Sequence, residues 1–185
     1  MVTKSGKSTQ AGCKYVQVLW WLVPVSAVLF VGCSLFGLGG GDEPKERTLE
    51  LTFVGSDQLN YDGTSSNVVQ VAVYVLTDID NFLGGQARAF FDDDFHQEFS
   101  AKFAADTVSK WIFTVRPGET ETCPVRYTYD ASRSKLMYLG VIGDFFKSPE
   151  NGRERSIYTL RNKSVERLTV TIEENYIGGI DETRR

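Results

Sequence analysis

The feature that most constrains the fold is a series of short segments in which apolar and polar residues alternate. Between residues 48 and 54, Leu49, Leu51 and Phe53 fall on one face and mainly polar residues on the other, as a half-buried strand requires. The segment 68–77 is apolar on both faces, which indicates a strand covered on both sides. The sequence therefore predicts a β-sheet protein whose second strand lies in the centre of a sheet.

The alternation continues toward the C-terminus. A turn signal, Arg116-Pro117-Gly118-Glu119, separates two alternating segments and predicts a hairpin. Further strands are expected at residues 111–115, 125–129, 135–146, 154–160 and 165–173. Short strands at this spacing predict a mainly β fold, a two-sheet antiparallel β-sandwich. The polar residues 178–185 are predicted to form a disordered tail.

A helical insertion is expected between the second and third strands. The two-residue period disappears between Asp78 and Lys110, and phenylalanine recurs every fourth residue from 91 to 103, which is typical of an amphipathic helix. Asp92 to Asp94 fall in its first turn, where carboxylates offset the positive end of the helix dipole. The helix should lie over an end or a face of the sheet.

An apolar, uncharged run from Tyr15 to Leu38 precedes the strands. Three lysines and no acid come before it, and within it small residues are followed by Cys33, as in a secretory signal peptide. The residues Phe30-Val31-Gly32-Cys33 resemble the bacterial lipobox, whose cysteine is lipidated and becomes the first residue of the mature protein. The alternative is an uncleaved membrane helix, because about 20 apolar residues span a bilayer. Both interpretations place the following residues outside the cytoplasm.

Cleavage before Cys33 would divide the chain into four parts. Residues 1–32 would be a lipoprotein signal peptide, 33–47 a lipidated cysteine and flexible tether, 48–177 the β-sandwich domain and 178–185 the tail. After residue 32 the chain has 17 basic and 24 acidic residues, a net charge of −7. An acidic exported domain is a poor candidate for nucleic-acid binding.

The cysteines and the histidine limit the chemistry. Cys13 would leave with the signal peptide and Cys33 would be acylated, so Cys123 is expected to be a buried strand residue without an intrachain disulfide partner. His96 is the sole histidine, which leaves a metal site with few nitrogen ligands and most catalytic triads without their base. The adjacent acids Asp92 to Asp94 are not spaced as in a calcium loop. We therefore expect no enzyme activity, cofactor, metal or small-molecule substrate.

Several short motifs follow one another in a fixed order. A strand, a loop with Asn and Asp before glycine, and a strand of the form V-x-V-Y-x-L occupy residues 49–76. Phe90-Phe91-Asp92 falls in the helical excursion, R-P-G-E lies at 116–119, and Y-L-G-V-I lies at 138–142. In this order the motifs resemble the TssJ (SciN/VasD) family, the outer-membrane lipoproteins of the bacterial type VI secretion system.

The resemblance implies a transthyretin-like sandwich, held by its lipid at the inner leaflet of the outer membrane, that carries out no reaction. It also implies a partner, the periplasmic domain of a TssM-like inner-membrane protein. The family's contact element is the loop between the first two strands, which corresponds here to Ser56 through Ser66. Within it, the expected partner-binding residues are Gln58, Leu59, Asn60, Tyr61, Asp62 and Gly63. Ser34, which follows Cys33 and is not aspartate, favours transfer to the outer membrane.

Two other functions stay open on the residues alone. One is a ligand-binding or carrier lipoprotein of the periplasm that uses the mouth of the sandwich. The other is an envelope hydrolase that uses a pair of carboxylates, because any two acids can meet in space. A stable protein partner would distinguish the assembly protein from both.

Overall fold

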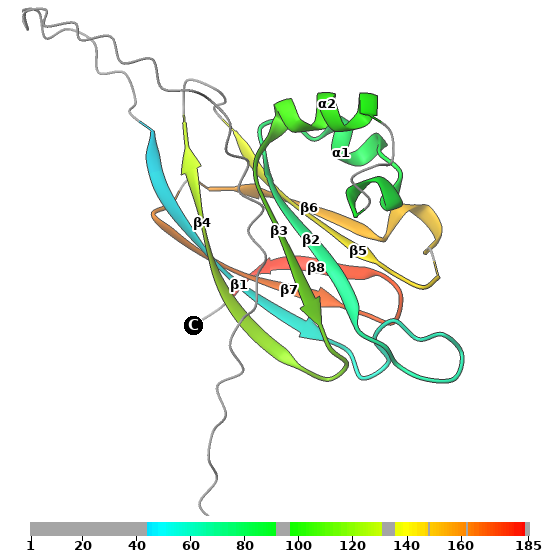
Figure 1. Cartoon of the computed structure of the whole chain (residues 1–185). Helices are drawn as coiled ribbons and strands as arrows, with labels where there is room; N and C mark the ends of the chain where they lie inside the picture. The colour runs from blue at the N-terminus through cyan, green and yellow to red at the C-terminus, as the bar shows by residue number, and fades with distance from the viewer. Residues whose placement is uncertain (1–43, 92–96, 131–135, 148, 162, 184–185) are drawn as a thin grey trace, which may run out of the picture.

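The computed structural model describes residues 44–91, 97–130, 136–147, 149–161 and 163–183 of the 185-residue chain. The strands in these residues are β1 (Lys45–Gly55), β2 (Val69–Leu76), β3 (Thr107–Val115), β4 (Thr120–Tyr129), β5 (Met137–Asp144), β6 (Arg155–Leu160), β7 (Val165–Ile172) and β8 (Ile177–Glu182). They form two four-stranded sheets, in the orders β4-β1-β7-β8 and β3-β2-β5-β6, which pack face to face (Figure 1). The expected two-sheet β-sandwich is confirmed.

The sheets are antiparallel except for one pair. β1 runs parallel to β7, with Thr48 opposite Val165 and Gly55 opposite Ile172, whereas the other pairings are antiparallel. A parallel pair needs a long connection. Here the chain between β1 and β7 includes the four strands of the other sheet. The sequence prediction of a wholly antiparallel sandwich is therefore wrong at this pair.

The second strand is central and covered on both faces, as predicted. One face of β2, with Val69, Val71, Val73 and Val75, packs into the core between the sheets. Its other face carries Ala72, Tyr74 and Leu76, which belong to a second cluster beneath the helical segments. Leu49, Leu51 and Phe53 of β1 are also buried between the sheets. The alternating pattern of β1 thus correctly predicts which of its residues face the core.

The helical insertion consists of three short pieces in the described residues: α1 (Asp80–Gly84), the 3₁₀ helix η1 (Ala87–Phe90) and α2 (Gln97–Asp106). They lie against the face of the β3-β2-β5-β6 sheet that points away from the other sheet (Figure 1). The predicted helix began near Phe91, but its first residues, Asp92 to His96, lie outside the described residues. Phe103 is buried and Phe91 half-buried, so these two members of the phenylalanine stripe face the sheet as expected.

Aromatic rings attach the insertion to the sheet. The centroid of Tyr74 on β2 lies 4.9 Å from that of Phe103, and Phe82 and Phe90 are 5.2 Å apart. The Phe90 carbonyl accepts hydrogen bonds from Tyr74 Oη at 3.0 Å and Lys110 Nζ at 3.2 Å. A Cβ at Gly140 of β5 would lie 2.9 Å from Phe82 Cζ, so the glycine of the Y-L-G motif makes room for this ring.

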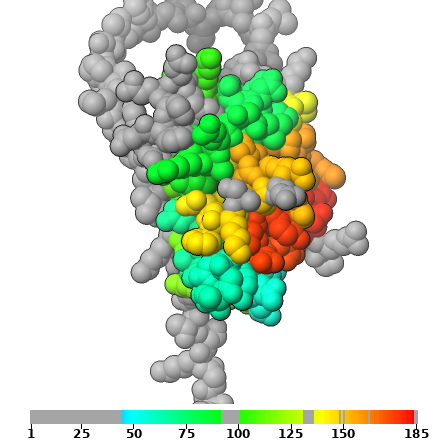
Figure 2. Space-filling view, turned by 90° about the vertical axis from the view of Figure 1, so that its right-hand side faces the viewer, coloured from blue at the N-terminus to red at the C-terminus, as the bar shows by residue number. Residues whose placement is uncertain are grey.

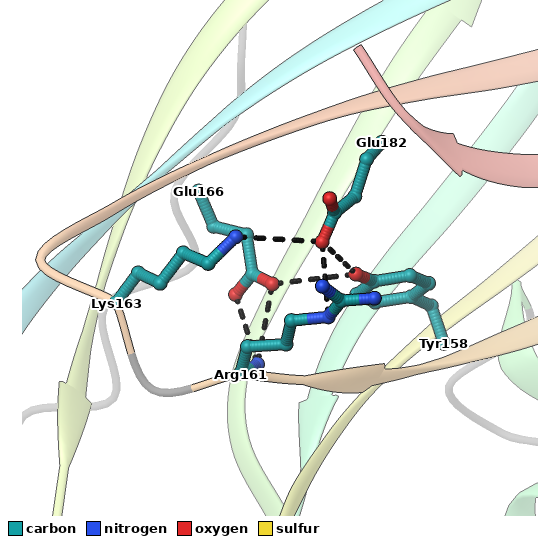
Figure 3. Close-up of polar contacts among 5 residues, drawn as sticks. All are labelled: Tyr158, Arg161, Lys163, Glu166 and Glu182. Atoms are coloured by element: carbon teal, nitrogen blue, oxygen red, sulfur yellow. Dashed lines mark hydrogen bonds and ion pairs between the residues drawn. The ribbon is translucent and has the colours of Figure 1, made fainter. Parts of the chain in front are cut away.

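The last strand corrects the prediction of a disordered tail. β8 pairs with β7 from Leu168↔Glu182 to Ile172↔Ile177, although polar residues and two glycines hid it in the sequence. Glu182 accepts hydrogen bonds from Tyr158 Oη of β6 at 3.0 Å and from Lys163 Nζ at 3.4 Å, and Arg161 Nε lies 3.0 Å from it (Figure 3). These contacts attach β8 to the other sheet through the β6–β7 turn.

A buried carboxylate completes this group. Glu166 of β7 is 2% exposed and accepts hydrogen bonds from the backbone N–H of Arg161 at 3.2 Å to each oxygen (Figure 3). Burial, and after it the charge of Glu166, raises the pKa of the nearby Tyr127 to about 12. Burial and the hydrogen bond to Glu182 raise the pKa of Tyr158 to about 12. Both tyrosines thus stay neutral at physiological pH.

Cys123 lies in β4 and is 1% exposed, so its expected burial is confirmed. It is also disulfide-bonded. The expectation that it has no intrachain disulfide partner is therefore wrong for this structure.

Candidate functional site

Four connections meet at one end of the sandwich, which we call the loop end: residues 56–68, 116–119, 145–154 and 173–176. The 56–68 segment, called the β1–β2 loop from here on, is joined to two of the others through its backbone. Ser56 N–H donates to Ile172 O at 2.9 Å, Tyr61 N–H to Glu174 O at 3.4 Å, and Ser56 O accepts from Gly118 N–H at 3.1 Å. Figure 2 shows this loop, in cyan and green, side by side with yellow and red-orange residues of the later connections. The loop is therefore part of a joined surface.

Asp62 organises the tip of the β1–β2 loop. Its Oδ1 accepts hydrogen bonds from the backbone N–H and the hydroxyl of Thr64, both at 2.7 Å, and from the N–H of Ser65 at 2.9 Å. These donors, the Thr64 hydroxyl first, hold the pKa of the Asp62 carboxyl well below its usual range. Gly63 has φ +109°, a conformation that residues with a Cβ rarely adopt. The tip is thus a tight turn closed by an ionised carboxylate.

Asn60 joins the β1–β2 loop to the β5–β6 connection. Its side chain is buried, 7% exposed, and its backbone has φ +48°, which asparagine tolerates better than most residues. The amide Nδ2 donates to Val68 O at 2.7 Å, and Oδ1 accepts from the N–H of Phe146 at 2.7 Å. One side chain therefore fixes the backbones of two loops.

The predicted site residues divide into two groups. Gln58 and Gly63 are exposed and Tyr61 and Asp62 half-buried, so these four lie where a partner could contact them. Leu59 is 0% exposed and packs in the core between the sheets, and Asn60 is nearly as buried. Both side chains are thus buried, and their expected role as partner contacts stays a prediction. Cys33, the predicted lipid attachment site, lies outside the described residues.

Sequence reasoning missed three residues of this end. Asn67 Nδ2 donates to Ser65 O at 3.1 Å and to Asn60 O at 3.3 Å, which closes the base of the loop. Val68 and Phe146 carry exposed apolar side chains, 50% and 70% exposed. The sequence placed both inside strands, although β2 begins at Val69 and β5 ends at Asp144. The aromatic residue directly before the polar segment Lys147-Ser148-Pro149 was the available signal.

The described residues of the loop end offer hydrogen-bonding and apolar surface. Within the described ranges, no three His, Cys, Asp or Glu side chains gather as metal ligands. In the same residues no helix has the length and apolar character needed to cross a bilayer. The arrangement fits recognition of another macromolecule by a surface of fixed shape.

Comparison with solved structures finds this fold in type VI secretion proteins. The TssJ1 lipoprotein of Pseudomonas aeruginosa aligns with a TM-score of 0.60 and 15% identity, over 76% of this chain and 99% of that chain. Lip of Serratia marcescens, described as a membrane-bound component of the type VI secretion system, aligns with a TM-score of 0.56 and 14% identity, over 74% and 97%. A chain in a structure titled as the TssM C-terminal domain from EAEC aligns with a TM-score of 0.53 and 16% identity, over 74% and 99%.

A search of curated proteins found no match to this chain. A sequence-family profile does match, over residues 47–175, which include β1 through β7. It is the profile of the type VI secretion lipoproteins named VasD, EvfM and TssJ (T6SS-SciN). The segment matched is more than half of the chain and ends beside the loop end described above. The chain therefore belongs to the type VI secretion lipoprotein family.

Proposed function

We propose that this chain is the outer-membrane lipoprotein of a type VI secretion membrane complex. It anchors a TssM-like inner-membrane component by binding its periplasmic domain, and it catalyses no reaction. The observation that carries the proposal is the β1–β2 loop, which is held in one shape by its own hydrogen bonds and presents Gln58, Tyr61, Asp62 and Gly63 at the surface. The family match and the structure whose title names TssM support this choice of partner.

The position of the loop suits a protein that links two membranes. β1 begins at Lys45, within the last residues of the proposed 33–47 tether, and ends at Gly55, where the loop starts. A strand of 11 residues at about 3.3 Å per residue is roughly 35 Å long, so the loop lies about that far from the point where the tether enters. The lipid would hold one end of the sandwich and the other end would point into the periplasm.

The anchor itself is proposed to be Cys33, acylated after removal of residues 1–32, with Ser34 favouring transfer to the outer membrane.

The first test is to purify the full chain from detergent-solubilised envelopes, measure its intact mass and identify the proteins that come with it. We expect a chain that starts at acylated Cys33 and brings a TssM-like protein. A chain that keeps residues 1–32 would overturn the proposed anchor. A chain without a protein partner would overturn the assembly role and favour the ligand-binding alternative.

The second test addresses the loop without disturbing the core. Gln58→Ala and Tyr61→Ala combined remove exposed or half-buried side chains and leave the buried Leu59 and Asn60 in place. We expect this variant to lose binding to the partner's periplasmic domain while its thermal unfolding is almost unchanged. Arg126→Ala on β4, also exposed, is the matched control and should bind normally. Normal binding by the loop variant would contradict the proposed contact surface.

A further inference from the structure

Two exposed apolar side chains lie at the loop end, on different connections. Phe146 is 70% exposed, more than any other large apolar side chain in the described residues, and Val68 is 50% exposed. Single exposed apolar residues are ordinary on protein surfaces. These two differ because the same buried amide, that of Asn60, binds the backbone of both. One buried side chain thus fixes the backbone at both exposed apolar positions, and we call these two side chains together the apolar patch.

The patch is fixed in advance of binding. Asn60 donates to Val68 O and accepts from Phe146 N–H, each at 2.7 Å, and it is itself only 7% exposed. A partner that docks on these side chains would not have to order the two backbones that carry them. Such preorganisation lowers the entropic cost of association, and a rigid aromatic residue at the centre of a contact often contributes a large part of the binding energy.

The charges near the patch indicate which charge a partner surface should carry. The described residues of the loop end include several exposed or half-buried carboxylates: Asp57, Asp62, Glu119, Glu173 and Glu174. The cations there are fewer, and two of them are engaged within the chain. Arg116 pairs with Glu119 at 3.5 Å, and the Arg153 guanidinium lies 3.6 Å from the centre of the Tyr176 ring. The described loop end thus carries more carboxylates than cations, which favours a positive partner surface.

We propose that Phe146 and Val68 form the apolar centre of the partner-binding surface, and that they dock on a basic surface with an apolar pocket on the periplasmic domain of the TssM-like partner. This inference rests on the proposed function and extends it from the β1–β2 loop to the β5–β6 connection. Polar rims around an apolar centre are the usual anatomy of protein interfaces. The partner is thereby defined by its chemistry as well as by its family.

The test compares the partner affinity of Phe146→Ala and Val68→Ala with that of a control variant at another exposed apolar residue. Leu136→Ala is the matched control, because Leu136 is 53% exposed and directly precedes Met137, which pairs with Leu160 at the opposite end of the sandwich. Dissociation constants are measured with full-length lipoprotein in detergent and the partner's periplasmic domain. We expect Phe146→Ala to weaken binding at least about tenfold and Val68→Ala by a smaller factor, with Leu136→Ala unchanged. All three side chains are exposed, so thermal unfolding should change little.

A salt titration on the wild-type chain tests the charge of the partner surface. We expect affinity to fall as sodium chloride is raised, because salt screens attraction between exposed charges. If Phe146→Ala binds as tightly as the wild type, or if wild-type binding does not weaken with salt, this inference is overturned and the proposed function still stands. No binding by the wild-type chain at any salt concentration would overturn both.

Discussion

The two ends of the sandwich are held by different kinds of polar contact. At the loop end, Asn60, Asp62 and Asn67 bond mainly to backbone groups of the loops they organise. At the opposite end, where β1 begins and β6 turns into β7, Glu182 is bonded by three side chains, two of them cationic (Figure 3). Bonds to backbone groups fix the path of a loop and leave the surface side chains available. Exposed ion pairs attach a strand, but salt and acid weaken them.

This difference suits the proposed roles of the two ends. A surface that recognises a partner benefits from a fixed shape that does not depend on solution conditions. The end that receives the tether needs only to keep β8 paired with β7. The comparison makes predictions for both ends, and those for buried groups of the loop end should have the largest effects.

Replacing Leu59 by alanine should have the largest effect on stability. Its side chain is 0% exposed and packs in the core between the sheets, so the change removes buried methyl groups and leaves a cavity. We expect a loss of about 2 to 5 kcal/mol in the free energy of unfolding, measured by urea denaturation. Partner binding by the variant that remains folded should be nearly normal. A variant of wild-type stability that has lost binding would restore Leu59 as a direct contact.

Asn60→Ala should have the next largest effect, because it leaves Phe146 N–H and Val68 O without their partner. Each buried polar group that loses its hydrogen bond costs about 1 to 3 kcal/mol, less where water can replace the partner. Hydrogen exchange should show faster exchange of the Phe146 amide, while the core strands keep their protection. Asn67→Ala is the matched control, since it removes an amide from the same loop without releasing Phe146. Equal exchange at Phe146 in both variants would show that Asn60 does not join the loops.

Much of the fold could be predicted from the sequence, because the buried faces of strands produce a regular pattern of apolar residues. β1 and β7 were predicted from alternating residues and β2 from a segment apolar on both faces, and Leu168, Val170 and Ile172 of β7 are all 0% exposed. β8 was missed because its sequence, IGGIDE, has two glycines and two acids. It is held by pairing to β7 and by the Glu182 contacts, which depend on residues distant in the sequence.

The site was predicted as a segment but not as a surface. Family resemblance selected residues 56–66, yet it could not separate Gln58, which is exposed, from Leu59, which is buried next to it. Phe146 joins the site only through a hydrogen bond to Asn60, 86 positions earlier in the chain. A contact of this kind has no periodic signature, so it becomes visible only in three dimensions.

At the opposite end, acid should release the contribution of Glu182. The hydrogen bond from Tyr158, and then the charges of Arg161 and Lys163, lower the pKa of Glu182 from its ordinary value of 4.5. A carboxyl whose pKa is lower in the folded state adds stability above its unfolded-state pKa, and this is lost as the pH falls through the folded value. Glu182→Gln should therefore melt at a lower temperature than the wild type at pH 7. The difference should begin to shrink below pH 4.5 and vanish once the pH is below the lowered folded-state pKa. A difference that persists in strong acid would show that packing rather than charge holds β8.

The loop end should respond least to acid, and Asp62 provides the test. Its hydrogen bonds from Thr64 and Ser65 hold its pKa well below the ordinary value of 3.8, so at pH 4 it should still be ionised and the turn closed. Carboxyl NMR titration should show the Asp62 resonance unchanged from pH 7 to pH 4. Thr64→Ala removes the hydroxyl donor, so the Asp62 pKa should rise toward its ordinary value. If the Asp62 carboxyl of the wild type titrates at its ordinary value of 3.8, the loop tip is not held by its carboxylate. The contrast in acid sensitivity between the two ends would then rest on Asn60 alone.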